Sequence, residues 1–459
     1  MRRFFPLLFA MLLTGISTSS QTVTVASSFF AITQNSYAAG HNTVGIKYGV
    51  LRFWNTNCVW SLIETSPGTY NWANCDTQIN RAIAMNAAPD FVMGRTPLSH
   101  VTGSCTGTFS GSSGCAQLPS DLSTTNAVLP AFITALYNHM HTNFPSVKWS
   151  IEGVNEADLA GECAPSTGGS GHCSMVELVL YQRTIYQTLK ALDSTITVLG
   201  PAASTFNRYG PHLYGGTDTS SAPFTGAGFL NAGGGAYLDV INMHPYFFCG
   251  TPAVSCTVPE NAIGAISALT PVLANYGVQN KPIIASESDW GSGAANTQAD
   301  NLKAAYLGRL YAYFWNAGYQ GVWWYAWDDH SDNLSAGFGT LCVGTSGSCT
   351  PNAAATAYAT WYNWLVGSTH TVNSCNTNVD GNSSYYCPLT LADGRTAAIV
   401  FNSAGSFSFS TTGSGFTTQY FQDGTSSSIS GNSVTIGLQP ILLSSPYTAP
   451  PTSLSATVN

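Results

Sequence analysis

Short apolar segments alternate with longer amphipathic segments along the first three quarters of the chain. Eight apolar segments of four to six residues are predicted as buried strands: Phe29–Thr33, Val50–Trp54, Asp90–Met93, Trp149–Val154, Thr197–Gly200, Asp239–Met243, Pro282–Ala285 and Gly321–Tyr325. Helical patterns lie between them, at Asp76–Met85, Leu129–His141, Val176–Leu192, Ile263–Tyr276 and Thr297–Asn316. Such alternation predicts a parallel sheet with helical crossovers.

Eight strand–helix units fit a closed (β/α)8 barrel, also called a TIM barrel, which we expect to occupy residues 27–367. The alternative is an open, doubly wound sheet. No glycine-rich phosphate-binding loop follows the first predicted strand, and this favours the barrel. In a barrel, the loops that follow the strands form the active face.

The pattern changes near residue 368, where helical periodicity gives way to alternating strands. The predicted strands are Ala397–Asn402, Ser406–Ser410, Thr417–Gln422 and Val434–Leu443, with hairpin turns at Asp393-Gly394 and Asp423-Gly424. We expect a small antiparallel β-sandwich over residues 368–446, to which residues 21–26 add a further strand. Residues 447–459 are rich in Pro, Ser and Thr and are predicted to be a tail or linker.

The first 20 residues have the features of a secretory signal peptide, with two arginines before an apolar run and small residues after it. We therefore expect a secreted, extracellular protein with no membrane span after cleavage. Charged residues make up only 8 % of the chain, against roughly 25 % in an average domain. The net charge of −8, with only 14 Lys and Arg, argues against a nucleic-acid partner. We expect a monomer.

Twelve cysteines fall into six close pairs, as expected for disulfides in an exported chain. The predicted bridges are Cys58–Cys75, Cys105–Cys115, Cys163–Cys173, Cys249–Cys256, Cys342–Cys349 and Cys375–Cys387. Four of these pairs lie in long loops after predicted strands, where they would brace the walls of a cleft. No pair has the spacing of a structural zinc site, and we expect neither a metal nor a cofactor.

Two of the seven glutamates directly follow predicted strands. Glu156 follows the fourth strand and Glu287 follows the seventh, so both would lie at the mouth of the barrel. Paired carboxyl groups cleave glycosidic bonds, because one protonates the leaving oxygen while the other attacks the anomeric carbon. Glu152, inside the fourth predicted strand, is the main rival of Glu156 for the role of the acid.

The residues around these glutamates resemble clan A of the retaining glycoside hydrolases. That resemblance implies that Glu156 is the acid/base and Glu287 the nucleophile. It also implies that Asn155 binds the sugar 2-hydroxyl, that His244 lines the sugar subsite, and that Arg52 and Tyr246 support the nucleophile. The pattern R-x-W, W, E, PG-x-Y-x-W and TP between residues 50 and 97 is most similar to family 39 and its biofilm-polysaccharide endoglycosidase relatives.

Several tryptophans lie at or just after the ends of predicted strands. Sugars stack their C–H faces on aromatic rings, so Trp54, Trp290 and Trp327 are candidate substrate contacts. Together these observations predict a secreted retaining hydrolase of β-linked polysaccharide or oligosaccharide. The alternative is a catalytically silent barrel that binds glycans.

Overall fold

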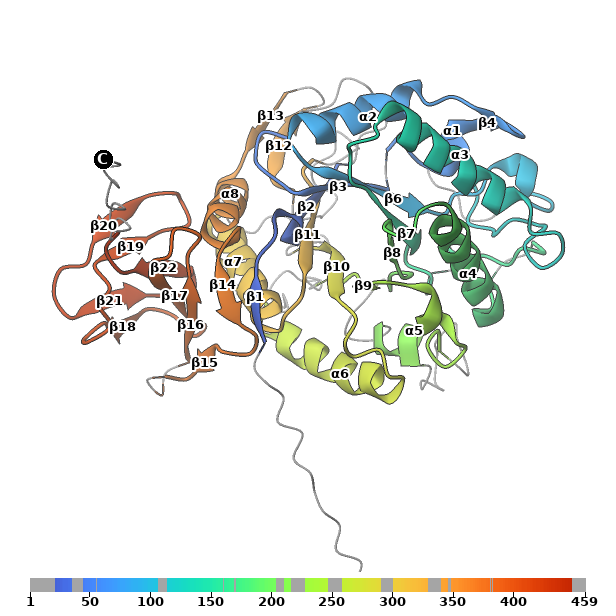
Figure 1. Ribbon diagram of the computed structural model, residues 1–459. Helices are drawn as coiled ribbons and strands as arrows, with labels where there is room; N and C mark the ends of the chain where they lie inside the picture. Colours follow the sequence, from blue (N-terminus) through green and yellow to red (C-terminus); the bar gives the residue numbers. More distant parts are fainter. Residues whose placement is uncertain are drawn as a thin grey trace, which may run out of the picture.

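A ring of parallel strands forms the centre of the molecule (Figure 1). The computed structural model describes residues 21–34, 44–54, 56–105, 114–159, 161–168, 171–203, 210–215, 228–246, 258–289, 300–328, 340–345, 348–379, 381 and 383–447. The ring contains β2 (Phe30–Thr33), β3 (Val50–Phe53), β6 (Ala88–Met93), β7 (Ser150–Val154), β8 (Thr197–Leu199), β9 (Ile241–Met243), β10 (Ile283–Ser288) and β11 (Gly321–Tyr325).

The strand order is β8-β7-β6-β3-β2-β11-β10-β9, and a parallel bridge between Leu199 and Val240 joins its two ends. The predicted (β/α)8 barrel is therefore confirmed, and the open doubly wound alternative is wrong. Each of the eight predicted strands overlaps one strand of the ring.

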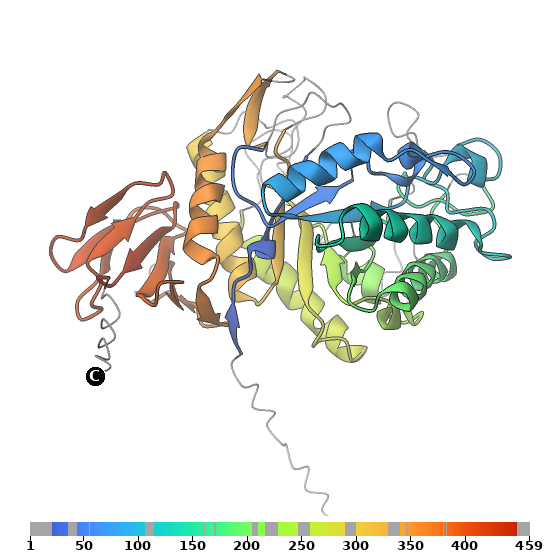
Figure 2. The same ribbon diagram turned by 45° about the horizontal axis from the view of Figure 1, so that its top comes forward.

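Helices surround the ring on its outer side (Figures 1 and 2). They are α1 (Trp60–Ile63), α2 (Ala73–Ala84), α3 (Val128–Asn143), α4 (Met175–Leu192), α5 (Gly210–Gly215), α6 (Asn261–Asn275), α7 (Asp300–Asn316) and α8 (Ala353–Leu365). The five predicted helical patterns correspond to α2, α3, α4, α6 and α7. Two small hairpins extend from the barrel: β4 (Glu64–Ser66) with β5 (Thr69–Tyr70), and β12 (Cys342–Thr345) with β13 (Ser348–Pro351).

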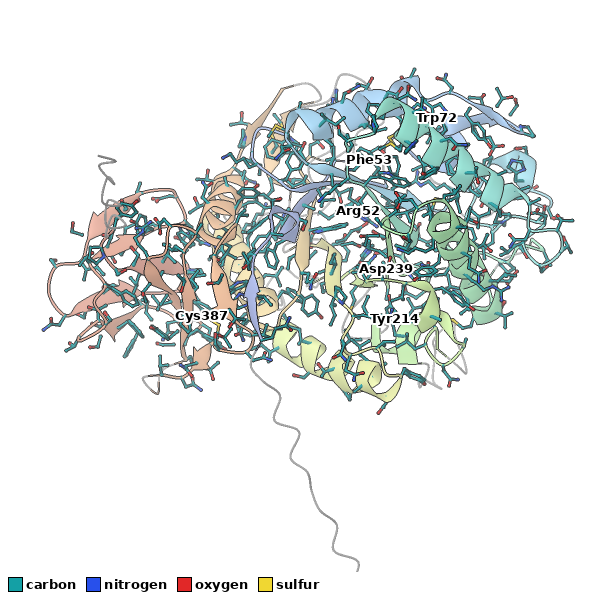
Figure 3. The ribbon with its side chains drawn as sticks, viewed as in Figure 1. Arg52, Phe53, Trp72, Tyr214, Asp239 and Cys387 are labelled. Carbon is teal, nitrogen blue, oxygen red and sulfur yellow. A yellow bond between two sulfur atoms is a disulfide. The ribbon has the colours of Figure 1, made fainter. Side chains whose placement is uncertain are left out.

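Alternation along the strands separates the barrel interior from the layer beneath the helices. On β3, Leu51 and Phe53 belong to the main hydrophobic core, whereas Val50 belongs to a separate small cluster with Ala31, Leu199, Val240 and Trp323. Successive side chains of a strand point to opposite faces, so Arg52 lies on the same face as Val50. Figure 3 shows Arg52 within the ring of strands. The barrel interior thus contains a small apolar layer. Polar side chains such as Arg52 lie two residues further along the strand, on the same face.

The second unit is an antiparallel β-sandwich. Its larger sheet contains β1 (Thr22–Thr24), β14 (Thr369–Thr371), β15 (Asn376–Thr377), β16 (Ser384–Thr390), β17 (Thr396–Asn402), β19 (Thr418–Tyr420), β20 (Ser426–Ser428) and β22 (Ile441–Ser444). β18 (Phe407–Ser410) pairs with β21 (Ser433–Ile436) in a second sheet. A small apolar cluster that includes Val400, Val434 and Leu443 packs in this unit. The expected additional strand is confirmed, because β1 pairs with β14.

One predicted strand is wrong in its extent. The segment Val434–Leu443 was expected to be continuous, but the structure divides it into β21 and β22, which belong to different sheets. Gly437 and Pro440 lie in the break, and proline cannot donate a hydrogen bond to a sheet ladder.

Five of the six predicted disulfides are present: Cys58–Cys75, Cys105–Cys115, Cys163–Cys173, Cys342–Cys349 and Cys375–Cys387. The sixth pair, Cys249 and Cys256, lies outside the described residues, as do the predicted signal peptide and residues 448–459 of the tail. Among the described helices, none combines the length and the apolar character that a membrane span requires.

Candidate active site

Glu156 and Glu287 face each other at the ends of two barrel strands. Glu156 follows β7, and Glu287 is the fifth residue of β10. One carboxylate oxygen of each lies within 4.8 Å of the other and of a ring nitrogen of His244. Retaining glycosidases hold their two carboxyl groups about 5–5.5 Å apart, whereas inverting enzymes separate them by about 6.5–9.5 Å. The separation is therefore much shorter than the inverting range and close to the retaining one.

Arg52 is completely buried and joins two carboxylates. Its Nε donates to Glu152 Oε2 at 2.8 Å, its Nη2 donates to Glu152 Oε1 at 2.6 Å, and its Nη1 donates to Glu287 Oε1. Burial would raise the pKa of Glu152, but the Arg52 guanidinium and His244 lower it to about 2. Glu152 is thus the ionised partner of Arg52, and this pairing favours Glu156 over Glu152 as the proton donor.

Tyr246 supports the second oxygen of Glu287. Its hydroxyl donates to Glu287 Oε2, so both oxygens of this carboxylate accept hydrogen bonds, one from Tyr246 and one from Arg52. Burial and then the negative charge of Glu287 raise the pKa of Tyr246 well above its usual value. The phenol therefore remains a donor throughout the physiological range.

His244 connects the two glutamates. Its Nδ1 lies 3.1 Å from Glu156 Oε1 and 3.5 Å from Glu287 Oε2, and its Nε2 lies 3.0 Å from Ser286 Oγ. Burial would lower the pKa of His244, but the surrounding carboxylates, Glu287 foremost, raise it to about 9. Burial raises the pKa of Glu156 above its ordinary value, with the His244 cation acting in the opposite direction. A raised pKa suits a general acid.

Asn155 and Glu156 lie in the turn that ends β7. Arg52 Nη2 donates to Asn155 Oδ1 at 2.8 Å, which fixes the amide next to the Arg52–Glu287 pair. Glu156 has a φ of 40°, in the left-handed region that non-glycine residues rarely adopt. Strained backbone of this kind is concentrated at functional sites.

The three candidate tryptophans have different surroundings. Trp54 is buried, and the Arg95 guanidinium stacks on its ring at 4.5 Å. Trp327 is 1 % exposed and belongs to the main hydrophobic core, so it does not present the open aromatic surface expected of a sugar platform. Trp290 lies outside the described residues.

Two further acidic residues at the site were not singled out as site residues from the sequence. Asp90, in β6, is completely buried and accepts a hydrogen bond from Ser150 Oγ at 2.5 Å, and burial together with Glu152 raises its pKa to about 7. Glu162 lies near Asn155, Glu156 and Glu287. The sequence feature that could have pointed to Asp90 is a charged residue within an apolar strand. Glu162 carries no such signal, because it lies in a loop.

Glu156, His244 and Glu287 are close enough to one another to suggest a metal site. In this structure the three groups contact one another instead: His244 Nδ1 lies 3.1 Å from Glu156 Oε1 and 3.5 Å from Glu287 Oε2, and these carboxylates raise the pKa of the imidazole to about 9.

Comparisons with solved structures identify the architecture. A family 39 glycoside hydrolase from Bacteroides cellulosilyticus WH2 aligns with a TM-score of 0.58 at 16 % identity, over 92 % of this chain and 81 % of that one. The chain shares the fold of glycoside hydrolases. A monomeric β-xylosidase from Caulobacter crescentus CB15 aligns with a TM-score of 0.60 at 13 % identity, over 92 % of this chain and 97 % of that one.

A family 30 endoxylanase from Clostridium papyrosolvens C71 also aligns, with a TM-score of 0.55 at 13 % identity, over 93 % of this chain and 97 % of that one. The resemblance to family 39 expected from the sequence is therefore confirmed at the level of the fold, which family 30 shares. No protein-family model matches the sequence, and no curated protein matches it either.

Proposed function

We propose that this chain is a secreted retaining glycoside hydrolase that cleaves β-linked polysaccharide or oligosaccharide. The observation that carries the proposal is the approach of Glu156 and Glu287 to within 4.8 Å, with both oxygens of Glu287 held by Arg52 and Tyr246. A binding protein has no need of a pair of carboxyl groups at this separation, one with a raised pKa and one held by a buried arginine.

The residues divide the reaction into two displacements. In the first, the Glu287 carboxylate attacks the anomeric carbon, and the Glu156 carboxylic acid gives its proton to the leaving oxygen. In the second, the Glu156 carboxylate takes a proton from water, and that water displaces Glu287 from the anomeric carbon. His244, whose other ring nitrogen contacts Ser286 Oγ, orients Glu156, and the two displacements need no cofactor.

The substrate and the location are parts of the same proposal. Two of the similar structures are named a β-xylosidase and an endoxylanase, so xylan and aryl β-xylosides are the first substrates to test. Five disulfides in the described part of the chain support an extracellular location, where oxidising conditions preserve such bonds.

The direct test is hydrolysis of a panel of xylan, mannan, β-glucan, microbial exopolysaccharide and aryl β-glycosides, with products separated by chromatography. We expect the wild type to hydrolyse at least one substrate. Glu287→Ala should lower turnover a thousandfold or more, and Glu156→Ala should lower it roughly 10²–10⁴-fold, as for the removal of an acid–base group. Glu177→Gln, which alters a glutamate that caps α4, is the matched control. Glycan binding without reducing-end release by the wild type would contradict the proposal and favour a silent binding protein.

A further inference from the structure

We propose that Glu162 is a specificity-determining residue that hydrogen-bonds one hydroxyl group of the sugar unit cleaved between Glu156 and Glu287. This inference rests on the proposed function. It concerns a residue outside the set implied by the clan A resemblance, and its contacts connect it to the reaction centre.

Glu162 lies next to the groups that hold the nucleophile. Leu159 N donates to Glu156 O at 2.8 Å and Glu162 N donates to Leu159 O at 2.9 Å, so Glu162 follows Glu156 in one compact turn. The Asn155 side chain is close enough to the Glu162 carboxyl group to lower its pKa. The Oδ1 atom of the same amide accepts from Arg52 Nη2 at 2.8 Å, and Arg52 Nη1 donates to Glu287. Glu162 is also near enough to Glu156 and Arg95 to interact with their charges. A sugar that contacts the two catalytic glutamates and Asn155 therefore comes within reach of Glu162.

The loop around Glu162 is braced at several points. The Glu162 amide donates to Leu159 O at 2.9 Å, and the next residue forms the Cys163–Cys173 disulfide. Ala164 then pairs with a neighbouring loop through its amide, which donates to Ala116 O at 2.9 Å, and its carbonyl, which accepts from Leu118 N at 3.1 Å. Such bracing holds the side chain in one position, as recognition of a single hydroxyl group requires.

One oxygen of Glu162 lacks a hydrogen bond. Oε2 is buried beneath neighbouring atoms and has no partner among the described residues, so a ligand reaches it only when those atoms move aside. An unsatisfied buried carboxyl oxygen destabilises the folded protein, so a retained one calls for a functional explanation. A sugar hydroxyl group placed beside Asn155 would satisfy it.

The protonation state of Glu162 suits a hydroxyl partner. Burial, followed by the charge of Glu156, raises the pKa of Glu162 well above its usual value. Three carboxyl groups in one buried site cannot all be ionised, and Glu287 is the one that Arg52 contacts directly. A neutral carboxylic acid both donates and accepts a hydrogen bond, as a hydroxyl group does. Glutamine has the same shape and the same two capacities.

The test uses aryl β-glycosides of the sugar that the wild type hydrolyses fastest, together with their 2-, 3- and 4-deoxy derivatives. We expect Glu162→Ala to lower kcat/KM on the parent glycoside by about ten- to a hundredfold, as for a buried hydrogen bond to a polar group. On one deoxy derivative the same substitution should have almost no effect, because the contact is already lost. Glu162→Gln should stay within about threefold of the wild type on the parent and keep its pH profile.

Three outcomes would contradict the inference without touching the proposed function. Glu162→Ala could lower kcat/KM equally on every deoxy derivative, which indicates a structural role. Glu162→Gln could abolish turnover, which would show that an amide cannot replace the carboxyl group in the proposed hydrogen bond. Glu162→Gln could also lose activity to the same extent as Glu162→Ala. Thermal unfolding of both variants, with Glu177→Gln as the control, separates folding defects from lost contacts. A wild type without glycosidase activity would instead contradict the proposed function itself.

Discussion

Arg52 contacts two buried carboxylates, and its contacts assign different tasks to chemically similar residues. It binds Glu152 through two hydrogen bonds and Glu287 through one, while Glu156 instead contacts His244. Breaking a buried ion pair by removing one partner costs about 3–5 kcal/mol, so such a network is stable only as a whole. Among these three carboxyl groups, only that of Glu156 has no direct contact with Arg52 in the described interactions. Burial can therefore raise the pKa of Glu156.

His244 controls the proton affinity of Glu156, and this makes the pH dependence testable. The His244 cation lowers the pKa of Glu156, so its removal should raise that pKa further. Activity falls with rising pH as the general acid loses its proton. In His244→Gln we therefore expect the basic limb of the kcat/KM profile to move to higher pH, along with a lower maximum rate.

The profile should be measured between about pH 4 and 10 on an aryl β-glycoside. Tyr246→Phe is the control, because it removes a hydrogen bond from Glu287 and leaves the contact between His244 and Glu156 in place. A basic limb that is unchanged, or that moves to lower pH in His244→Gln, would contradict the role given to His244.

The residues at strand ends could be predicted from the sequence, whereas those in loops could not. Glu156 and Glu287 follow apolar strands, and the strand count alone places them at one end of the barrel. Asp90 gave a weaker signal, as a charged residue in an apolar segment. Glu162 reaches the site only because the Cys163–Cys173 bridge and the neighbouring loop position it, and no local pattern encodes that contact.

At the scale of elements, the strands were easier to predict than the last helix of the barrel. Barrel strands are buried on both sides and are therefore short continuous apolar runs. Helix α8 was not predicted, because eight of its thirteen residues are buried and it has no clear polar face. Its N-cap is Asn352, whose side chain accepts from Ala355 N at 3.0 Å. Periodicity cannot reveal a helix that is covered on most sides.

The disulfide next to Glu162 gives a prediction at this scale. Replacing both Cys163 and Cys173 by serine should lower the free energy of unfolding by about 2–3 kcal/mol, since the bridge closes a short loop. The freed loop should also lower kcat/KM, because Glu162 loses its fixed position. Denaturant unfolding and steady-state kinetics measure the two effects.

The matched control replaces Cys375 and Cys387, which close a loop of similar length in the β-sandwich. That variant should lose a comparable amount of stability while keeping its kcat/KM. An equal loss of activity in both double variants would contradict a specific role for the loop around Glu162.

The whole molecule has a core that extends from the barrel into the β-sandwich. Figures 1 and 2 show α7 and α8 between the two units. Trp361 of α8 belongs to the same hydrophobic cluster as Leu389 and Ile399 of the sandwich, and Tyr313 of α7 packs against Phe401 with ring centroids 5.8 Å apart. The change of pattern near residue 368 predicted a second unit. It could not reveal a shared core, because the contacts join segments far apart in the sequence.

The shared core predicts that the barrel does not fold without the sandwich. A chain that ends after Gly367 loses β14, the partner of β1, and exposes the apolar face of α8. We expect this truncated chain to be aggregated or loosely packed, and the full chain to unfold in one calorimetric transition. A soluble truncated barrel with wild-type thermal stability would contradict a shared core.

The assignment of Glu156 and Glu287 is tested most directly by the anomeric configuration of the glycosyl azide that each alanine variant forms when azide is added. In Glu156→Ala, azide should replace water on the intact covalent intermediate and give the β-glycosyl azide. In Glu287→Ala, azide should replace the missing nucleophile on the opposite face and give the α-glycosyl azide from an activated β-glycoside. Proton NMR distinguishes the two. The reverse pattern, or the same anomer from both variants, would contradict the account.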